Sequence, residues 1–285
     1  MPTKNEKYRA ILKKPTATVA ANIFDPLSAR IAQILGYEVL VLSGSVGKAS
    51  NLASPDLVVS MFPDVQDHSR RIARNTDLPL MIDAEDGFGN AVNVWRAVRE
   101  LEMAGVSGIE IEDNVVTKEF GIANPGLNPI ATHVGKLEAA VAAKTDPSTV
   151  IIARTATWGE DREHAVERIT AYGKTGAEAF MLTGVKSKED VAASHKAAPN
   201  IPITILGAPP EVRTDAKFCA DNNVKILMLG NPTYSVAVKA IYDTLKYLKD
   251  GGDMAALKDK QADPKLTRQI IRTDEFEAWQ KKYMR

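Results

Sequence analysis

The chain has 285 residues, of which 45% are hydrophobic and 25% charged, the composition of an ordinary globular protein. Its 36 basic and 36 acidic residues cancel, so the charge favours neither nucleic acid nor an anionic membrane as a partner. Cys219 is the sole cysteine, which excludes an intramolecular disulfide and is typical of a reducing compartment. The N-terminal stretch is charged and no run of 18 apolar residues exists. We therefore expect a soluble, cytoplasmic protein that binds no membrane.

Short apolar segments bounded by glycine or polar residues recur along the chain and predict eight strands. In chain order they lie within residues 16–25, 34–44, 78–84, 103–113, 148–155, 174–184, 201–207 and 221–230. Helical patterns separate most of them, and several begin after a glycine or asparagine of the kind that ends a helix. Eight alternating strand–helix units predict a (β/α)8 TIM-type barrel, with a doubly wound open sheet as the alternative.

We expect the barrel to form one catalytic domain over residues 1–250, followed by a C-terminal helical extension over residues 251–285. The segment 44–64 is longer than a usual connection between a strand and its helix and is predicted to cover the active site. The extension is amphipathic and carries Phe276 and Trp279. It either packs on its own barrel or is exchanged with a neighbouring subunit, and exchange within a homo-oligomer is favoured.

Two neighbouring predicted strands end in carboxylates. They read LMIDAEDGFGN at residues 80–90 and GIEIEDN at residues 108–114, and their acids are Asp83, Glu85, Asp86, Glu110, Glu112 and Asp113. Alternate residues of a strand point to the same face, so Asp83 is expected beside Glu85, and the two glutamates of the second segment beside each other. Buried like charges need a counter-ion, and clustered carboxylate oxygens suit a hard cation, Mg²⁺ first. The alternative is that these acids cap the following helices and face water.

The segment SGSVGKAS at residues 43–50 fails as a phosphate-binding P-loop, because its first glycine is missing and no serine or threonine follows Lys48. What remains is a turn of small residues at a strand end, formed by Ser43, Gly44 and Ser45. Backbone N–H groups in such a turn could bind a carboxylate or a developing oxyanion. The alternative is a simple tight turn.

Arg154 follows the apolar residues of IIART at residues 151–155, so it lies at the end of a predicted strand. A guanidinium at that place suits bidentate capture of a substrate carboxylate. The alternative is a structural ion pair with one of the clustered acids.

In combination and in this order, these motifs resemble those of the isocitrate lyase and phosphoenolpyruvate mutase superfamily. The matching parts are residues 43–45, Asp56, DAEDGFGN at residues 83–90, IED at residues 111–113 and IIART. The resemblance runs through nearly the whole chain. It implies an α/β barrel, exchange of a C-terminal helix between subunits, assembly as dimers or tetramers, and binding of magnesium together with a small-molecule 2-oxo acid or a relative of one.

The resemblance also implies roles by position. It assigns four acids to the metal, Asp83 as the direct ligand and, through the water shell, Asp56, Glu85 and Glu112. It places Ser43, Gly44, Ser45 and Arg154 around the substrate as catalytic residues. Asn231, at a strand end late in the barrel, is predicted to bind the substrate as well. One departure is Glu85, since the superfamily usually has aspartate there.

A larger departure lies at residues 118–122, where lyases of the superfamily carry Lys-x-Cys-Gly-His. This chain has Phe120 and Ile122 in place of the cysteine and histidine, and neither can transfer a proton. Phe-Gly at this place is similar to the oxaloacetate decarboxylase branch, and decarboxylation needs no base to start it. The prediction is therefore a lyase that depends on Mg²⁺, with Mn²⁺ as an alternative, and that converts a 2-oxo dicarboxylate, most simply oxaloacetate, to pyruvate and CO2 through a metal-stabilised enolate.

Three alternatives stay open. A carbon–carbon lyase acting on a methylisocitrate- or dimethylmalate-like acid would need a base that the sequence does not reveal. A mutase or hydrolase acting on phosphonopyruvate or phosphoenolpyruvate would rest on Lys118. A barrel that binds a metabolite without turnover would have no reason to retain clustered carboxylates.

Overall fold

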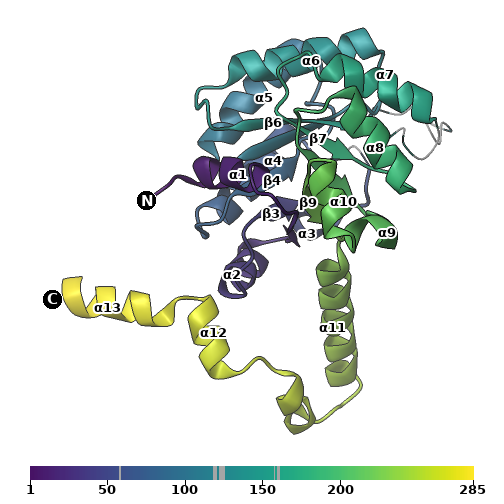
Figure 1. The fold of residues 1–285 in the computed structure, drawn as a ribbon. Helices are drawn as coiled ribbons and strands as arrows, with labels where there is room; N and C mark the ends of the chain where they lie inside the picture. The colour runs from purple at the N-terminus through teal and green to yellow at the C-terminus, as the bar shows by residue number, and fades with distance from the viewer. Residues whose placement is uncertain (58, 118–120, 122–125, 157, 159–160) are drawn as a thin grey trace.

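The structure, a computed structural model, describes residues 1–57, 59–117, 121, 126–156, 158 and 161–285. The strands of the described chain form one parallel sheet in the order β1-β9-β8-β7-β6-β5-β4-β3-β2. β1 (Thr18–Val19) pairs with β9, and β2 (Ala21–Asn22) pairs with β3. Because β1 and β2 are the two halves of one strand interrupted at Ala20, the sheet closes into a barrel with eight strand positions (Figure 1). The predicted (β/α)8 barrel is confirmed.

The other strands all fall inside the predicted segments. They are β3 (Leu40–Leu42), β4 (Leu80–Asp83), β5 (Gly108–Glu112), β6 (Val150–Thr155), β7 (Ala179–Leu182), β8 (Ile203–Leu206) and β9 (Val224–Met228). Nearly all of their residues are buried, as expected for a parallel sheet whose outer face is covered by helices.

Helices follow the strands around the barrel. They are α2 (Pro26–Ile34), α4 (Phe62–Ala73), α5 (Ala91–Met103), α6 (Ile130–Ala143), α7 (Arg162–Tyr172), α8 (Lys188–Ala197), the short pair α9 (Pro210–Arg213) and α10 (Ala216–Asp221), and α11 (Pro232–Lys249). Helix α5 begins at Ala91 because the side chain of Asn90 accepts hydrogen bonds from first-turn N–H groups. Its buried face follows the helical spacing of Val94, Val98 and Leu101, which packs it against the sheet. No described helix is long and apolar enough to cross a membrane, and the location of the protein in the cell stays a prediction.

Helix α1 (Lys4–Leu12) precedes the barrel and closes the amino-terminal end of its strands. The ring of Tyr8 is fully buried and lies against Gly108, where an added Cβ would be 3.0 Å from Tyr8 Cζ. Its hydroxyl lies 3.4 Å from the sulfur of Met81. Apolar side chains fill the barrel around this ring, including Ile11, Val41, Val150, Ile152, Met181, Ile226 and Met228. The interior is therefore packed below the carboxyl ends of the strands.

The segment 44–64 differs from the expected long loop, because it contains helix α3 (Gly44–Leu52). Ser43 is the residue before the first helical position, so Ser43, Gly44 and Ser45 form the start of a helix and not an isolated turn. The helix ends at Leu52, because the next residue, Ala53, has a left-handed φ of 52° that cannot continue it.

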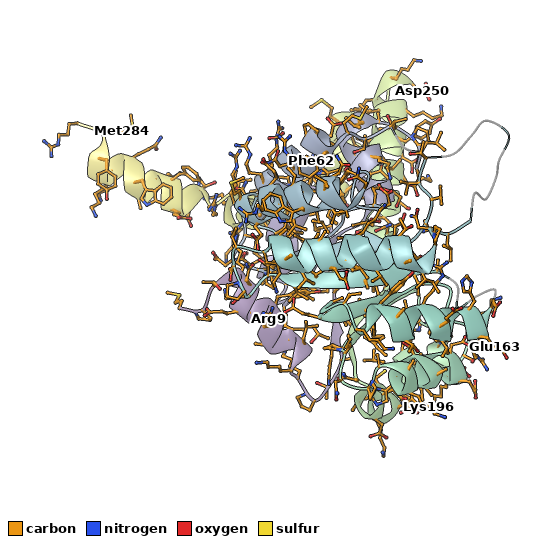
Figure 2. All side chains as sticks on the ribbon, turned by 90° about the horizontal axis from the view of Figure 1, so that it is seen from above. Arg9, Phe62, Glu163, Lys196, Asp250 and Met284 are labelled. Atoms are coloured by element: carbon orange, nitrogen blue, oxygen red, sulfur yellow. The ribbon has the colours of Figure 1, made fainter. Side chains whose placement is uncertain are left out.

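The C-terminal part of the chain extends away from the barrel (Figure 1). α11 projects from it, and none of its residues is buried. The chain continues through a 3-10 helix (Met254–Lys260), α12 (Pro264–Ile270), which returns to α2, and α13 (Thr273–Tyr283). α13 stands apart from the body of the molecule with Met284 at its far end (Figure 2), and Phe276 and Trp279 on it are half exposed. The domain boundary at residue 250 and the exchange of the extension stay predictions.

Candidate active site

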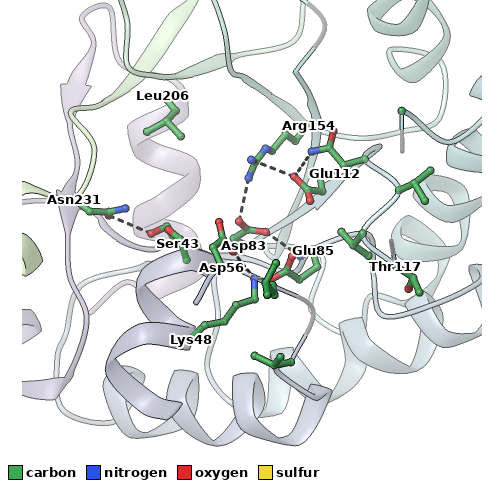
Figure 3. Close-up of a pocket in the computed structure, with 17 residues that line it drawn as sticks. Ser43, Lys48, Asp56, Asp83, Glu85, Glu112, Thr117, Arg154, Leu206 and Asn231 are labelled. Carbon is green, nitrogen blue, oxygen red and sulfur yellow. Dashed lines mark hydrogen bonds and ion pairs between the residues drawn. The ribbon is translucent and has the colours of Figure 1, made fainter. Parts of the chain in front are cut away.

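A pocket of about 620 Å³ lies at the carboxyl ends of the strands (Figure 3). Eight of the nine predicted site residues line it: Ser43, Ser45, Asp56, Asp83, Glu85, Glu112, Arg154 and Asn231. The ninth, Gly44, lies between the two serines, and its N–H donates to Asp83 Oδ2 at 3.3 Å. The structure thus brings all nine together at the end of the barrel where such enzymes carry their active sites.

The register of the sheet places Arg154 among three acids. Asp83 pairs with Glu110 on the neighbouring strand, and Glu112 pairs with Arg154. Arg154 Nη1 donates to Asp83 Oδ2 at 3.0 Å and to Glu110 Oε1 at 2.7 Å, and Nη2 lies 3.1 Å from Glu112 Oε2. The expectation that the two glutamates share a face is confirmed, because both contact the same guanidinium. Arg154 also forms the structural ion pairs that were the alternative to substrate binding.

Asp83 is held by donors on both of its oxygens. Oδ1 accepts from the N–H of Glu85 at 2.9 Å, and Oδ2 accepts from Gly44 and Arg154. Strand β4 ends at Asp83, and Glu85 has a left-handed φ of 51°. The prediction that strand alternation brings Asp83 and Glu85 to one face is therefore wrong in its reason, since a tight turn and not the strand places Glu85 at the pocket.

Lys48 is a residue of the pocket for which the sequence analysis found no role. Its side chain is only 5% exposed, and Nζ donates to Asp56 Oδ1 at 3.0 Å and to Glu85 Oε1. Burial alone would lower the pKa of Lys48, but the hydrogen bonds and attraction of these two acids outweigh it and raise that pKa. Only the helix that the structure shows places Lys48 on the same face as Ser45 three residues earlier.

Asn231, which follows the last strand of the barrel, is hydrogen-bonded to residues at the ends of the first strands. Its Oδ1 accepts from Ser43 Oγ at 3.1 Å and from Asn22 Nδ2 at 3.2 Å. Ser43 follows β3 and Asn231 lies just after β9, so Asn231 orients the hydroxyl of Ser43 across the first strand, β1 and β2, which lies between them in the closed barrel. This contact places Asn231 beside the start of α3, as its predicted place in the substrate site requires.

Two acids of the predicted cluster are paired elsewhere. Asp86 Oδ2 accepts from the buried Nζ of Lys136 at 2.9 Å, and Asp113 Oδ2 accepts from Arg168 Nη1 at 3.0 Å and Tyr172 Oη at 2.8 Å. Neither acid lines the pocket. These two buried ion pairs hold the residues directly after β4 and β5, and their formation needs partners that are distant in sequence.

The pocket acids are incompletely neutralised by the two cations. Burial raises the pKa of Glu110 to about 8 and that of Glu112 to about 7, although Arg154 opposes both shifts. Burial, followed by the charge of Asp83, raises the pKa of Glu85 as well. Carboxylates that resist ionisation in this way would gain from an additional positive charge.

The donor chemistry fits a hard divalent cation. Gly44 has no side chain, and Asp83 Oδ2 and Glu85 Oε1 lie 3.1 Å and 2.8 Å from the position that its Cβ would take. Oxygens of two carboxylates therefore lie close together beside the backbone of Gly44, and carboxylate oxygens are the donors that Mg²⁺ prefers. Among the side chains that the structure describes, no three acid, histidine or cysteine residues form a ready metal cluster, and Arg154 and Lys48 lie between the acids (Figure 3).

Gly44 gives a direct test of this convergence. A methyl group at position 44 would push against Glu85 Oε1 and Asp83 Oδ2, while alanine suits a helix better than glycine does. We expect Gly44→Ala to keep the thermal stability of the protein and to weaken Mg²⁺ binding by about tenfold, measured by calorimetry.

The control is Gly47→Ala in the same helix, where the nearest atom to an added Cβ is 3.9 Å away. This variant should bind Mg²⁺ normally and gain up to about 1 kcal/mol of stability. Equal effects of the two substitutions on Mg²⁺ binding would contradict a site at Gly44.

The residues that separate the lyase and decarboxylase interpretations lie outside the described part of the chain. These are residues 118–120 and 122, including Phe120 and Ile122. The loss of the proton-transferring cysteine and histidine therefore stays a prediction from the sequence.

Comparison with known proteins decides the family. Residues 8–249 match the sequence profile described as phosphoenolpyruvate phosphomutase. The chain belongs to this family. An oxaloacetate decarboxylase of Bradyrhizobium diazoefficiens is 35% identical over 277 residues, which cover 97% of this chain and 95% of the relative. Another oxaloacetate decarboxylase, from Chromohalobacter salexigens, is 38% identical over 279 residues, covering 97% and 94%.

Solved structures share the complete fold. A phosphonopyruvate hydrolase in complex with oxalate and Mg²⁺ matches with a TM-score of 0.86 at 28% identity, covering 100% of both chains. An oxaloacetate acetylhydrolase matches with a TM-score of 0.83 at 27% identity, covering 99% of both. A 2,3-dimethylmalate lyase of the phosphoenolpyruvate mutase/isocitrate lyase superfamily matches with a TM-score of 0.84 at 26% identity, covering 99% of both. The predicted superfamily membership is confirmed.

Proposed function

We propose that this family member is a Mg²⁺-dependent lyase that decarboxylates oxaloacetate to pyruvate and CO2. The observation that carries the proposal is the placement of Asp83, Arg154 and the start of α3 around one pocket. It is supported by curated relatives named oxaloacetate decarboxylase that span nearly the whole chain. Among the described residues that line the pocket there is no histidine or cysteine, which agrees with a reaction that needs no base to begin.

Asp83 would hold the metal ion directly, with Asp56, Glu85 and Glu112 holding its water shell. When bound, Mg²⁺ acts as a Lewis acid toward the C2 carbonyl oxygen of the substrate. Mn²⁺ would serve in its place, because the same oxygen ligands suit both ions.

The start of α3 would bind the substrate carboxylate at C1. The first N–H groups of a helix lack partners within the helix and carry partial positive charge, so they favour an anion. The same donors would stabilise the negative charge that develops on the C2 oxygen as the bond to the remote carboxylate breaks and CO2 leaves. A proton from water then converts the enolate to pyruvate. Ser43, whose hydroxyl is held by Asn231, adds an oriented polar group at this point.

Arg154 would orient the substrate from the side of Asp83 that lies away from Lys48 (Figure 3). Its guanidinium is anchored by Glu110, which is buried beneath it, and its contact with Glu112 lies at the pocket surface. A substrate carboxylate can take the place of Glu112 at Nη2 while the contact to Glu110 persists.

The leading alternatives are separated by three substrates, each tested in its own sample: oxaloacetate, 2,3-dimethylmalate and phosphonopyruvate. The protein is incubated with Mg²⁺ and oxaloacetate, and the products are followed by NMR against a sample with metal alone. Pyruvate formed faster than in the metal-only sample supports decarboxylation. Oxalate and acetate would instead indicate the hydrolysis named for the oxaloacetate acetylhydrolase neighbour, and turnover of 2,3-dimethylmalate or phosphonopyruvate alone would overturn the proposal.

Binding of Mg²⁺ should depend on pH through Glu112. Burial raises the pKa of this residue to about 7, so its carboxyl group is increasingly protonated below that pH and loses its attraction for a hydrated cation. We expect the Mg²⁺ affinity measured by calorimetry to fall as the pH is lowered from about 8 to about 6. Glu112→Gln should weaken binding and flatten this dependence; an unchanged pH dependence in the variant would assign it to another group.

We further propose that the protein is a homo-oligomer, a dimer or tetramer. An apolar groove of about 440 Å³ lies between α2 and α11, lined by residues such as Leu27, Ile31, Leu35 and Val236. Exposed apolar surface of this kind on a projecting helix is typical of an interface, and a helix of a second copy would cover it. Light scattering during size-exclusion chromatography should give a multiple of 30.9 kDa, and Val236→Glu should shift the protein toward the monomer.

A further inference from the structure

Lys48 holds two of the predicted metal acids in ion pairs. Its ammonium group joins Asp56, on the segment after α3, to Glu85, on the turn after β4. Lys48 and Arg154 lie on opposite sides of Asp83 (Figure 3). Each cation therefore neutralises a different part of the acidic site.

Lys48 contacts the oxygen of Glu85 that lies near Asp83, beside the backbone of Gly44. Glu85 Oε1 accepts from Lys48 Nζ, and the same oxygen lies 2.8 Å from the position of a Cβ on Gly44. Asp83 Oδ2 lies 3.1 Å from that position and belongs to the other carboxylate. A hydrated divalent ion held by both carboxylates would compete with the lysine for Glu85 Oε1.

A buried lysine at this place acts on cations and anions in opposite directions. Lys48 is nearly fully buried, so its charge is screened less by solvent than that of a surface lysine. It repels a metal ion that approaches Glu85 and Asp56. It attracts an anionic ligand that enters the same pocket, which Lys48 also lines.

We propose that Lys48 is an internal counter-ion that weakens the binding of Mg²⁺ to the free protein and strengthens the binding of the anionic ligand that follows. The inference rests on the proposed magnesium site. Lys48 is then a positioning residue that sets the order of binding. Without metal, its charge partly neutralises Asp56 and Glu85. When metal and anion are both bound, their charges balance the remaining charges of the site. Reciprocity of coupled binding requires that the anion then tightens the metal.

Calorimetry with Mg²⁺ alone, and with oxalate at saturating Mg²⁺, tests the proposal without turnover. We expect Lys48→Met to tighten Mg²⁺ binding by about tenfold and to weaken oxalate binding by a similar factor, because one positive charge is removed from a poorly solvated site. A merely structural role would weaken both. Lys48→Arg, which keeps the charge, should resemble the unchanged protein in both measurements.

The matched control is Lys217→Met, since Lys217 forms a single ion pair with Asp221 on the surface. It should leave both affinities unchanged. If Lys48→Met does not fold, Lys48→Gln carries the same expectation, because it also removes the charge. Unchanged or weaker Mg²⁺ binding in the Lys48 variants overturns this inference alone, whereas the absence of Mg²⁺ binding in the unchanged protein overturns the proposed function as well.

Discussion

Replacement of Asp83 by asparagine is expected to lower the rate of oxaloacetate decarboxylation by about three orders of magnitude, because the several kcal/mol contributed by a Lewis acid are lost with the direct metal ligand. Both carboxylate oxygens of Asp83 accept hydrogen bonds, from the N–H groups of Glu85 and Gly44 and from Arg154. An amide would turn an NH2 group toward one of these donors. The variant should therefore also lose Mg²⁺ affinity. NMR turnover assays and calorimetry measure the two effects.

Asp221→Asn is the control for this substitution. Asp221 is exposed and forms one ion pair with Lys217, four residues earlier on α10. Its replacement should change neither turnover nor Mg²⁺ binding. If Asp83→Asn retained decarboxylation within about tenfold of the unchanged protein, direct metal ligation by Asp83 would be contradicted. Thermal unfolding of both variants would confirm that the comparison is made between folded proteins.

Replacement of Arg154 by leucine is expected to abolish turnover and to destabilise the protein by about 3 kcal/mol at pH 8, since breaking a buried ion pair leaves uncompensated charge. The acids left behind would be Asp83, Glu110 and Glu112. The loss should be smaller at pH 5. Glu110 and Glu112 have pKa values raised by burial to about 8 and about 7, so the folded state favours their protonated forms, and the cost of their charge appears as the pH rises through these values.

Urea unfolding of Arg154→Leu at pH 5 and pH 8 measures this dependence, and added Mg²⁺ should restore part of the stability at pH 8. Arg96→Leu serves as the control, because Arg96 is largely exposed and lies 3.9 Å from Glu100 in a weak surface pair. An equal loss of stability at both pH values would indicate that lost packing, not uncompensated charge, explains the effect of Arg154→Leu.

The barrel and its acidic end could be predicted because both follow from local patterns. The apolar segments predicted the positions of the strands to within a few residues, and parallel strands in a barrel bring their carboxyl ends together. That rule alone placed Asp83, Glu112 and Arg154 in one pocket. It did not distinguish them from Asp86 and Asp113, because the partners that hold these two acids elsewhere come from helices remote in the chain.

Helix α3 could not be predicted from its own composition. Gly44 and Gly47 are poor helix formers, and serine and asparagine also favour turns. The helix depends on tertiary contacts, the burial of Val46 and the ion pairs of Lys48. Because the sequence did not predict this helix, it did not place Lys48 on the same helical face as Ser45, and the lysine had no predicted role.

The packing of Tyr8 and Met81 in the barrel closes the active site toward the amino-terminal end of the strands. Among the described residues, side chains fill the interior beneath Glu110 and leave no passage from Arg154 to the amino-terminal end of the strands. Substrate and product therefore both pass the carboxyl-terminal end of the barrel. Pyruvate that has not left occupies the path of the next oxaloacetate, and the product should behave as a competitive inhibitor whose effect grows as the reaction proceeds.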